Sequence, residues 1–305
     1  MRHALRFLLR IALSILLLGT IVWAIDSAGV YRRLTSADFS WFFLAVILGI
    51  VANIFSAWRW QIIAQKLGLA TNTHTLLSAY GQGVTLNTIL PGATLGGDAY
   101  RAVALQKLGN PMLKAAASVA LDRLSGLWAL FVISWLAWLG FALSPSFTLQ
   151  PGALVFHVAA LSLAVIAPFG AGWLNQQLSL DPKSLPTRFL QLFSETARLA
   201  QATFLSSLLV QLATIASLWA ALHAVNPEVP VLYLIAIAAP VFLATALPLS
   251  VGGYGTREAA MATYYLLAGL PPDIAVAGAL LHGLAVTLQG ILWAPLFLLD
   301  AHREK

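Results

Sequence analysis

Cysteine is absent from this chain of 305 residues, and charged residues are scarce, at 9% of the sequence. The missing cysteines exclude disulfide bonds, thiolate metal sites and cysteine nucleophiles. The shortage of charge excludes a water-soluble globule, because soluble domains carry about a quarter charged residues. Hydrophobic residues make up 60% of the chain, with 10 Trp and 15 Phe. This composition predicts one integral membrane domain over residues 1–305, whose net charge of +6 acts in membrane topology and not in nucleic-acid binding.

Sequence motifs of common catalytic and cofactor sites are also missing. The chain has no His-Glu-x-x-His spacing, phosphate-binding loop, nucleophile elbow or dinucleotide fingerprint in a βαβ context. We therefore expect no catalytic residue, no metal and no cofactor, in a protein that is not an enzyme. A membrane-embedded transferase with Asp122 or His282 as its base is the less favoured alternative.

Long apolar runs predict an all-α membrane protein with six full spans. A helix needs about 20 apolar residues to cross the hydrocarbon core. Such runs cover Phe7–Ile25, Trp41–Ile63, Leu121–Leu143, Ala153–Leu174, Ala200–Ala224 and Ile274–Leu299. The first run has a basic start and no small-residue cleavage site close after it, so we interpret it as a retained helix and not as a signal peptide.

Two further apolar segments, Leu76–Leu90 and Val231–Leu247, each end at a break rich in proline and glycine. A short helical piece follows each break, at Ala99–Leu108 and Arg257–Ala268, and neither piece is long enough to span. Each segment with its piece is predicted to form a re-entrant or broken-helix hairpin. Irregular backbone at membrane depth is tolerated only where it is buried in protein or lines a polar cavity.

The charge pattern orients these segments. Lys and Arg gather before the first span, around the first hairpin, in the linker Asn175–Leu199 and in the tail, whereas Ser144–Gly152 carries no charge. The positive-inside rule then places both termini in the cytoplasm, and the two hairpins enter from opposite sides. Halves 1–150 and 151–305 would form an inverted repeat, whose interface commonly holds the substrate. A count of eight full spans makes the halves parallel instead.

The two breaks carry related polar residues, since a glycine pair precedes an arginine in each. Free N–H groups at a helix N-terminus bind anions, and the planar fork of an arginine suits phosphate oxygens. We predict a site for a phosphate or phosphodiester. Its ligands are Gly96, Gly97, Arg101, Gly252, Gly253 and Arg257. The alternative is that the arginines anchor the chain at the interface and the glycines only turn it.

Acidic residues lie beside both breaks. Asp98 and Glu258 can pair with the arginines of these breaks, cap a helix or meet a cationic headgroup. We favour a cap for Asp98, which precedes the helix, and an interaction with the helix dipole for Glu258 in the first turn. Asp122-Arg123 would lie about 15 Å along a helix that starts near Met112. The pair either faces a polar interior or lies at the cytoplasmic interface. Helix–helix hydrogen bonds account for the remaining polar residues in or beside spans, which are Asn53, Arg59, Asn87 and Gln289.

The segments Asn87–Arg101, Ala120–Gly126 and Pro248–Glu258 resemble, in order and spacing, the lysylphosphatidylglycerol synthase transmembrane region, also called the flippase-like domain family. The resemblance implies a multi-pass domain, which we assign to the bacterial cytoplasmic (inner) membrane. In the namesake synthases this region translocates aminoacylated phosphatidylglycerol. The substrate-binding residues that the resemblance implies are Asp98, Arg101, Asp122, Arg123, Arg257 and Glu258.

This chain departs from the namesake synthases in two ways. The cytosolic aminoacyl transfer domain has no counterpart here, so synthesis of lysylphosphatidylglycerol is not expected. Ala93-Thr94-Leu95 also replaces a more glycine-rich version of the first motif.

Two functions are therefore considered. The first is a flippase-like transporter that moves a phosphate-containing headgroup of a membrane lipid between leaflets. The alternative is an accessory subunit of an envelope-glycolipid or glycosyl-transfer system, with an envelope-biosynthesis enzyme as its partner.

Overall fold

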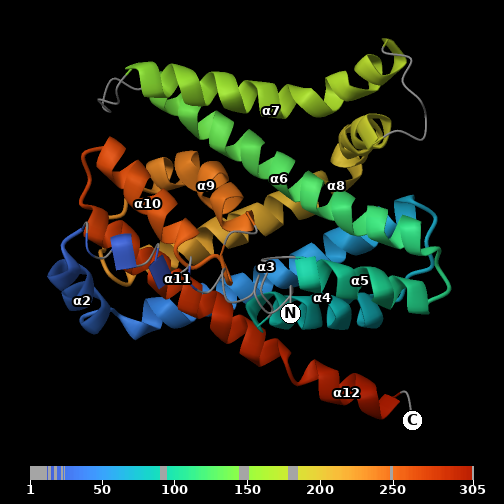
Figure 1. The fold of residues 1–305 in the computed structure, drawn as a ribbon, viewed down its shortest axis with the longest axis horizontal. Coiled ribbons are helices and arrows are strands. Elements are labelled where there is room, and N and C mark those ends of the chain that lie inside the picture. Colours follow the sequence, from blue (N-terminus) through green and yellow to red (C-terminus); the bar gives the residue numbers. More distant parts are fainter. Residues whose placement is uncertain are drawn as a thin grey trace.

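The computed structural model of the chain describes residues 25–89, 95–143, 151–177, 185–247 and 250–303, together with positions 12, 15, 16, 19–21 and 23. The elements of these ranges are helices, and Figure 1 labels them. They are α2 (Ser27–Thr35), α3 (Phe39–Lys66), α4 (Thr73–Ile89), α5 (Leu95–Lys107), α6 (Met112–Ala142), α7 (Pro151–Gln177), α8 (Leu185–His223), α9 (Val231–Ala246), α10 (Thr256–Leu267), α11 (Pro272–Trp293) and α12 (Leu296–Arg303).

Five helical stretches of the described chain are long and apolar enough to cross a membrane. They are Phe39–Lys66, Met112–Phe141, Leu154–Ala171, Ala202–His223 and Pro272–Leu299. These stretches confirm five of the predicted spans. The remaining one, Phe7–Ile25, lies for the greater part outside the described residues and stays a prediction. The chain is thus a multi-pass integral membrane protein of the helical class.

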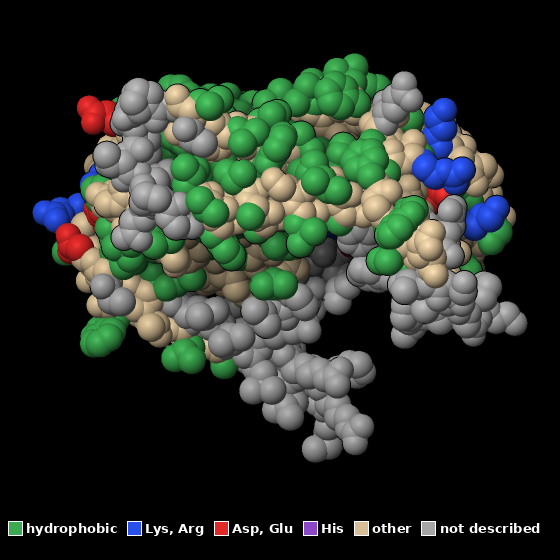
Figure 2. Space-filling model, turned by 90° about the horizontal axis from the view of Figure 1, so that it is seen from above, with side chains coloured by type: hydrophobic (Ala, Val, Ile, Leu, Met, Phe, Trp, Pro, Cys, Tyr) green, Lys and Arg blue, Asp and Glu red, His purple; other side chains and the backbone are tan. Residues whose placement is uncertain are grey.

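The surface of the molecule separates charge from apolar side chains. Figure 2 shows Lys, Arg, Asp and Glu at two opposite ends of one face, with a broad apolar band between them. Large apolar side chains exposed on the surface include Ile47 of α3, Leu163 of α7 and Phe204 of α8. The long helices run between the two charged ends (Figure 1). A band of this kind suits contact with lipid tails, because water would penalise so much exposed apolar surface.

The centre of the fold is the contact between α3 and α8. There the hydroxyl of Ser217 donates a 2.7 Å hydrogen bond to the carbonyl oxygen of Ala45. Around this contact α4 packs against α11, and α6 packs against α9. The hydroxyl of Thr85 joins the first of these interfaces through a 2.7 Å bond to the carbonyl oxygen of Gly290. The α4–α5 pair lies toward one end of the molecule and the α9–α10 pair toward the other (Figure 1).

A short helix follows each of the two proline-containing breaks, as the sequence predicts. α5 and α10, with 13 and 12 residues, are roughly 20 and 18 Å long. Both lengths fall short of the hydrocarbon core of about 30 Å. The preceding helices α4 and α9 end at Ile89 and Ala246, next to the proline-containing breaks. Leu90 to Thr94 of the first break, and Pro248 and Leu249 of the second, lie outside the described residues.

Helix α9 contains Pro240, which cannot donate a backbone hydrogen bond to the carbonyl four residues earlier. That carbonyl belongs to Ala236, and it accepts a 2.9 Å bond from the indole N–H of Trp138 on α6. The hydroxyl of Ser134, also on α6, donates to the carbonyl oxygen of Ile235 at 2.9 Å. Helix α6 therefore satisfies the backbone that the proline frees, as a broken helix inside a membrane requires.

Two helices extend beyond their predicted limits. α6 begins at Met112, the start that places Asp122-Arg123 well inside the helix, and not at Leu121, where the predicted span begins. α8 begins at Leu185, which makes much of the predicted linker Asn175–Leu199 helical. Leu199 packs with Ile63 of α3 and Leu121 of α6. This apolar contact lies just before the predicted span Ala200–Ala224 and buries that part of α8 against α3 and α6.

Candidate functional site

One cavity of about 250 Å³ is lined by residues from both hairpins, the α4–α5 pair and the α9–α10 pair. Asn87 and Thr88 line it from the last turn of α4, and Gly252 and Gly253 line it from the segment before α10. α3, α8 and α11 contribute further lining residues. The backbone next to both breaks therefore borders a shared polar space, as irregular backbone at membrane depth requires.

Arg101 reaches this cavity from α5, and only 2% of the residue is exposed. One terminal nitrogen, Nη2, donates a 2.6 Å bond to the Asp122 carboxylate, and Nη1 lies 3.4 Å from Asp98. The guanidinium carbon lies 4.3 Å from the ring centre of Trp60 and 4.5 Å from that of Tyr80. Aromatic faces attract cations, and more strongly when water is excluded. Carboxylates and rings together hold this guanidinium in one orientation.

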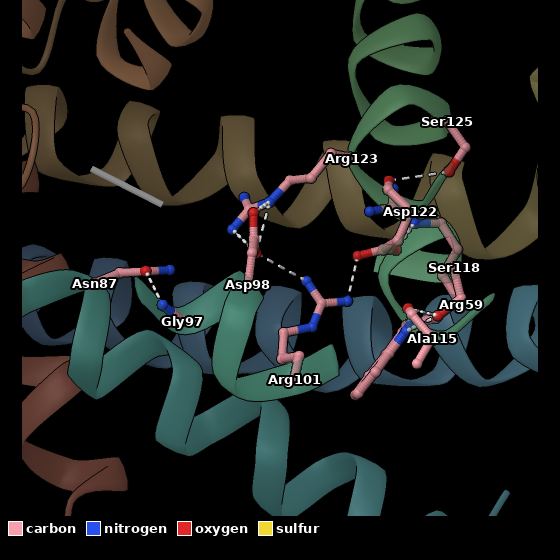
Figure 3. A network of polar contacts seen from close by, with 11 residues as sticks. Arg59, Asn87, Gly97, Asp98, Arg101, Ala115, Ser118, Asp122, Arg123 and Ser125 are labelled. Atoms are coloured by element: carbon pink, nitrogen blue, oxygen red, sulfur yellow. Dashed lines mark hydrogen bonds and ion pairs between the residues drawn. The ribbon is translucent and has the colours of Figure 1, made fainter. Parts of the chain in front are cut away.

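Asp122 lies at the centre of the buried ion pairs (Figure 3). Its second carboxylate oxygen, Oδ1, accepts a 2.8 Å bond from Nε of Arg59 on α3. The side chains of Asp122 and Arg59 are 1% and 5% exposed. One carboxylate thus joins α3, α5 and α6 through two arginines. The close approach of Arg59 to α6 depends on Gly126, because a Cβ there would lie 2.8 Å from Nη1 of Arg59.

Asp98 and Arg123 complete the cluster on the side of the cavity. Nη2 of Arg123 donates a 2.8 Å bond to Asp98, and its Nε lies 3.0 Å from the other carboxylate oxygen. The Arg123 side chain is 41% exposed and lines the cavity. Three guanidinium groups, of Arg59, Arg101 and Arg123, face two carboxylates in this cluster. The cluster therefore carries a formal charge of +1.

The first glycine pair acts in helix packing. Gly96 and Gly97 lie in the first turn of α5, and the N–H of Gly97 donates a 2.8 Å bond to the side-chain oxygen of Asn87. A Cβ on Gly97 would lie 2.2 Å from the carbonyl oxygen of Gly83. The prediction that this amide binds an anion is wrong, because Asn87 occupies it. The prediction that Asp98 caps the helix is also wrong, since α5 begins at Leu95 and Asp98 pairs with arginines.

The second break is built on glycines in the left-handed region. Gly252, Gly253 and Gly255 have φ angles of 58°, 78° and 90°, which side chains with a Cβ rarely adopt. The turn delivers the chain to α10, whose first-turn Glu258 accepts a 2.6 Å bond from the N–H of Gly255. This bond is the acidic half of a capping box, and it satisfies a donor at the helix N-terminus. The placement of Glu258 in the first turn is as predicted.

Arg257 is the second buried guanidinium on the cavity, with 1% of the residue exposed. Its Nη2 lies 3.0 Å from Glu258, and its Nε donates a 3.1 Å bond to the carbonyl oxygen of Ala279 on α11. Gly283, one turn along α11, leaves room for it, because a Cβ there would lie 2.2 Å from Nη2. The arginine is thus held by the Glu258 carboxylate and by its hydrogen bond to α11, beside Gly283.

Three residues on the cavity carry buried nitrogens that have no hydrogen-bond partner in the described part of the chain. These are Nε of Arg101, Nε2 of Gln289 and Nδ1 of His282. The side-chain oxygen of Gln289 is used, since it accepts a 3.2 Å bond from Asn53. Buried polar groups without partners are costly. The lining therefore retains hydrogen-bonding capacity that the protein itself does not use.

Sequence reasoning located the arginines but not all of their partners. The structure brings Arg101, Arg123, Arg257, Gly252 and Gly253 onto one cavity, with the carboxylates of Asp98, Asp122 and Glu258 paired to the arginines. Arg59, Asn53, Asn87 and Gln289 were predicted to make helix–helix hydrogen bonds, and the bonds Arg59–Asp122, Asn53–Gln289 and Gly97–Asn87 confirm this. The prediction did not name Asp122 as the partner of Arg59, and Trp60 and Tyr80 were not singled out. A signal for Arg59 was present, because a charge inside an apolar run requires a counter-charge, and Asp122 lies in another such run.

Comparison with known proteins bears on this arrangement. Residues 7–294 match the family described as the lysylphosphatidylglycerol synthase TM region. The chain belongs to this family. The match includes both broken helices and every arginine of the site. The UPF0104 membrane protein MJ1595 of Methanocaldococcus jannaschii is 24% identical over 319 residues, which cover 96% of this chain and 94% of that protein.

Proposed function

We propose that this protein is a flippase-like transporter that moves the phosphate-containing headgroup of a membrane lipid between leaflets, while the acyl chains stay in lipid. We place it in the bacterial cytoplasmic (inner) membrane, with both termini in the cytoplasm. One observation carries the proposal: Arg101 and Arg257, which follow different broken helices, line the same cavity. Guanidinium groups are the side chains best suited to phosphate oxygens.

The energetics of the headgroup support this use of the cavity. A charged phosphate cannot cross the hydrocarbon core without polar partners, because an isolated buried ion is strongly penalised. The cluster around Asp122 has more guanidinium groups than carboxylates, so an anion in the cavity reduces an excess of buried charge. The unused donors of Arg101 and Gln289 add hydrogen-bonding capacity in the same lining.

The packing pattern supports an inverted repeat of α3–α6 and α8–α11. A helix that precedes the hairpin (α3, α8) is followed in each unit by two short helices and one long one. The contacts are symmetric under this correspondence: α3 meets α8, α4 meets α11, and α6 meets α9. The hairpins lie toward opposite ends of the molecule (Figure 1). In such repeats the substrate lies at the interface of the units, and rocking of one unit against the other exposes it alternately to each side.

Reconstitution into liposomes tests the proposal. Lipids with a fluorescent acyl chain are quenched from outside, and the rate at which inner-leaflet lipid becomes accessible is measured. We expect a higher rate than in empty liposomes for at least one phospholipid. Arg257→Met should lower it about ten- to a hundredfold, because hydrogen bonds to charged groups contribute about 1.5–3 kcal/mol.

Arg198→Met is the matched control, because this arginine is paired and 76% exposed on α8 and does not line the cavity. It should transport like the wild type. Size-exclusion chromatography establishes that each variant is folded. Rates equal to those of empty liposomes for every phospholipid would contradict the proposal, and stable co-purification with an envelope enzyme would then favour a subunit role.

A further inference from the structure

We infer that the headgroup bound in the cavity is a phosphodiester monoanion that carries hydroxyl groups and no ammonium group, as in a glycerol or sugar phosphodiester. This inference rests on the proposed function and narrows its substrate class. It combines the charge of the lining with the direction of the hydroxyl groups in it.

The charge of the lining is one-sided. Among its described residues are three arginines, Arg101, Arg123 and Arg257, and no aspartate or glutamate. The nearby carboxylates of Asp98 and Glu258 are engaged by these arginines. The break segments outside the described residues, 90–94 and 248–249, contain no acidic residue in the sequence. An ammonium group in the cavity would therefore face three guanidinium groups with no carboxylate in the described lining to balance it.

The net formal charge of the ion-paired groups beside the cavity indicates which ligand charge the cavity suits. The five ion-paired groups around Asp122 leave +1, and Arg257 with Glu258 contributes zero. A single phosphodiester carries one negative charge and neutralises this excess. A headgroup with a further ammonium would restore an unpaired positive charge in a buried space, where charge is least tolerated. The cavity therefore disfavours zwitterionic and aminoacylated headgroups.

Three threonine hydroxyls on the cavity use their hydrogen within the protein, so their oxygens remain free to accept a bond from a ligand. Thr88, Thr214 and Thr245 each donate to the backbone carbonyl four residues earlier, at 3.0, 2.8 and 2.8 Å. A hydroxyl has one hydrogen and two lone pairs, so each of these oxygens is left to accept a bond. They come from α4, α8 and α9, and so from both units. Neutral acceptors suit uncharged donors, and the hydroxyls of a glycerol or sugar headgroup are such donors.

A panel of acyl-labelled lipids in the liposome assay tests the inference. Phosphatidylglycerol has one phosphodiester charge and two hydroxyls, and phosphatidylmethanol has the same charge and no hydroxyl. Phosphatidylcholine is zwitterionic, and lysylphosphatidylglycerol is cationic. We expect phosphatidylglycerol to move about three- to tenfold faster than phosphatidylmethanol, in keeping with one hydrogen bond. It should move at least about tenfold faster than the two lipids that carry ammonium groups.

Thr88→Val and Thr214→Val remove an acceptor and keep the shape of the side chain. Each should lower the ratio of the phosphatidylglycerol rate to the phosphatidylmethanol rate, which a general loss of folding would not do. Thr263→Val is the matched control, since this exposed threonine makes the same bond to the carbonyl four residues earlier, at 2.8 Å, and does not line the cavity. It should leave the ratio unchanged.

The outcomes distinguish a failure of the headgroup inference from a failure of the transporter proposal. Movement of lysylphosphatidylglycerol or phosphatidylcholine as fast as phosphatidylglycerol would overturn this inference and leave the transporter proposal standing. Equal rates for phosphatidylglycerol and phosphatidylmethanol would overturn its hydroxyl part. Movement of none of the four lipids would overturn the proposed function itself. Uptake of radiolabelled glycerophosphoglycerol in place of lipid movement would make the free headgroup, and not the lipid, the substrate.

Discussion

Asp122→Asn is the most informative single substitution in this structure. The wild-type carboxylate accepts bonds of 2.8 Å from Arg59 and 2.6 Å from Arg101, and the three side chains are at most 5% exposed. An asparagine keeps one oxygen as an acceptor for one arginine but turns an amide N–H₂ group toward the other. The formal charge of the cluster rises from +1 to +2, and Arg59 loses the one charged partner that it has among the described residues.

The expected cost follows from this burial. Removing one partner of a buried ion pair destabilises a protein by about 3–5 kcal/mol. At about 1.4 kcal/mol for each factor of ten, the unfolding equilibrium shifts by roughly two to three and a half orders of magnitude. Asp98→Asn should cost much less, about 1 kcal/mol or below, because its strongest partner, Arg123, is 41% exposed and its bond to the buried Arg101 is long, at 3.4 Å.

Denaturant unfolding in detergent micelles measures both variants, with the midpoint followed by Trp fluorescence and a size-exclusion profile as a check on folding. The double variant Arg59→Gln/Asp122→Asn returns the cluster charge to +1, so it should recover at least about 1 kcal/mol relative to Asp122→Asn alone. An Asp122→Asn midpoint equal to that of the wild type would refute the argument that this carboxylate balances two buried arginines. A double variant less stable than Asp122→Asn would refute the charge count.

Three further predictions concern Arg101 and Arg257, two of the arginines that line the cavity. Gly283→Ala puts a Cβ 2.2 Å from Nη2 of Arg257 and should lower transport about tenfold and stability by about 1–3 kcal/mol, whereas Gly140→Ala, with no atom within 4 Å, should not destabilise the protein in the same unfolding assay; equal effects of the two would contradict the steric argument. Arg101→Lys removes the planar fork and the stack between two rings, so transport in liposomes should fall about tenfold although a positive charge remains, and an unchanged rate would show that charge alone suffices. Glu258→Gln should lower the free energy of unfolding by about 1.5–3 kcal/mol, because the Gly255 N–H and Arg257 lose a charged acceptor, and a loss below 0.5 kcal/mol would argue against that role.

The spans and the breaks could be read from the sequence because they depend on local composition. The five long helices occur where apolar runs predict them, and α5 and α10 follow the breaks as short pieces. Helix limits were less predictable. α8 begins at Leu185, well before the apolar run, and Leu199 of this extension packs on Ile63 and Leu121, which are far away in the sequence. Hydrophobicity in a window carries no information about such a partner.

For the site, the sequence indicated which charged side chains are costly to bury in a membrane. It did not indicate which groups would pair with them. Arg101 and Arg257 were expected to share a cavity, and they do. The amide of Gly97 was expected to be free, and its partner Asn87 became evident only from the close packing of α4 and α5. Arg59 belongs to the cluster because α3 crosses α6 at Gly126. Each miss concerns a partner on another helix, which a local motif does not specify.

The contact of Gly83 with Gly97 constrains how the molecule can move. Because the two backbones are this close, α4 and α5 cannot slide past each other without separating. The first hairpin is therefore expected to move as one rigid body. Under the proposed function, we expect the opening and closing of the cavity to take place at the α4–α11 interface, where Thr85 donates a hydrogen bond to Gly290. Because the chain has no cysteine of its own, a pair of introduced cysteines reports on this directly. A cross-link across that interface should arrest lipid movement, and one between α4 and α5 should not.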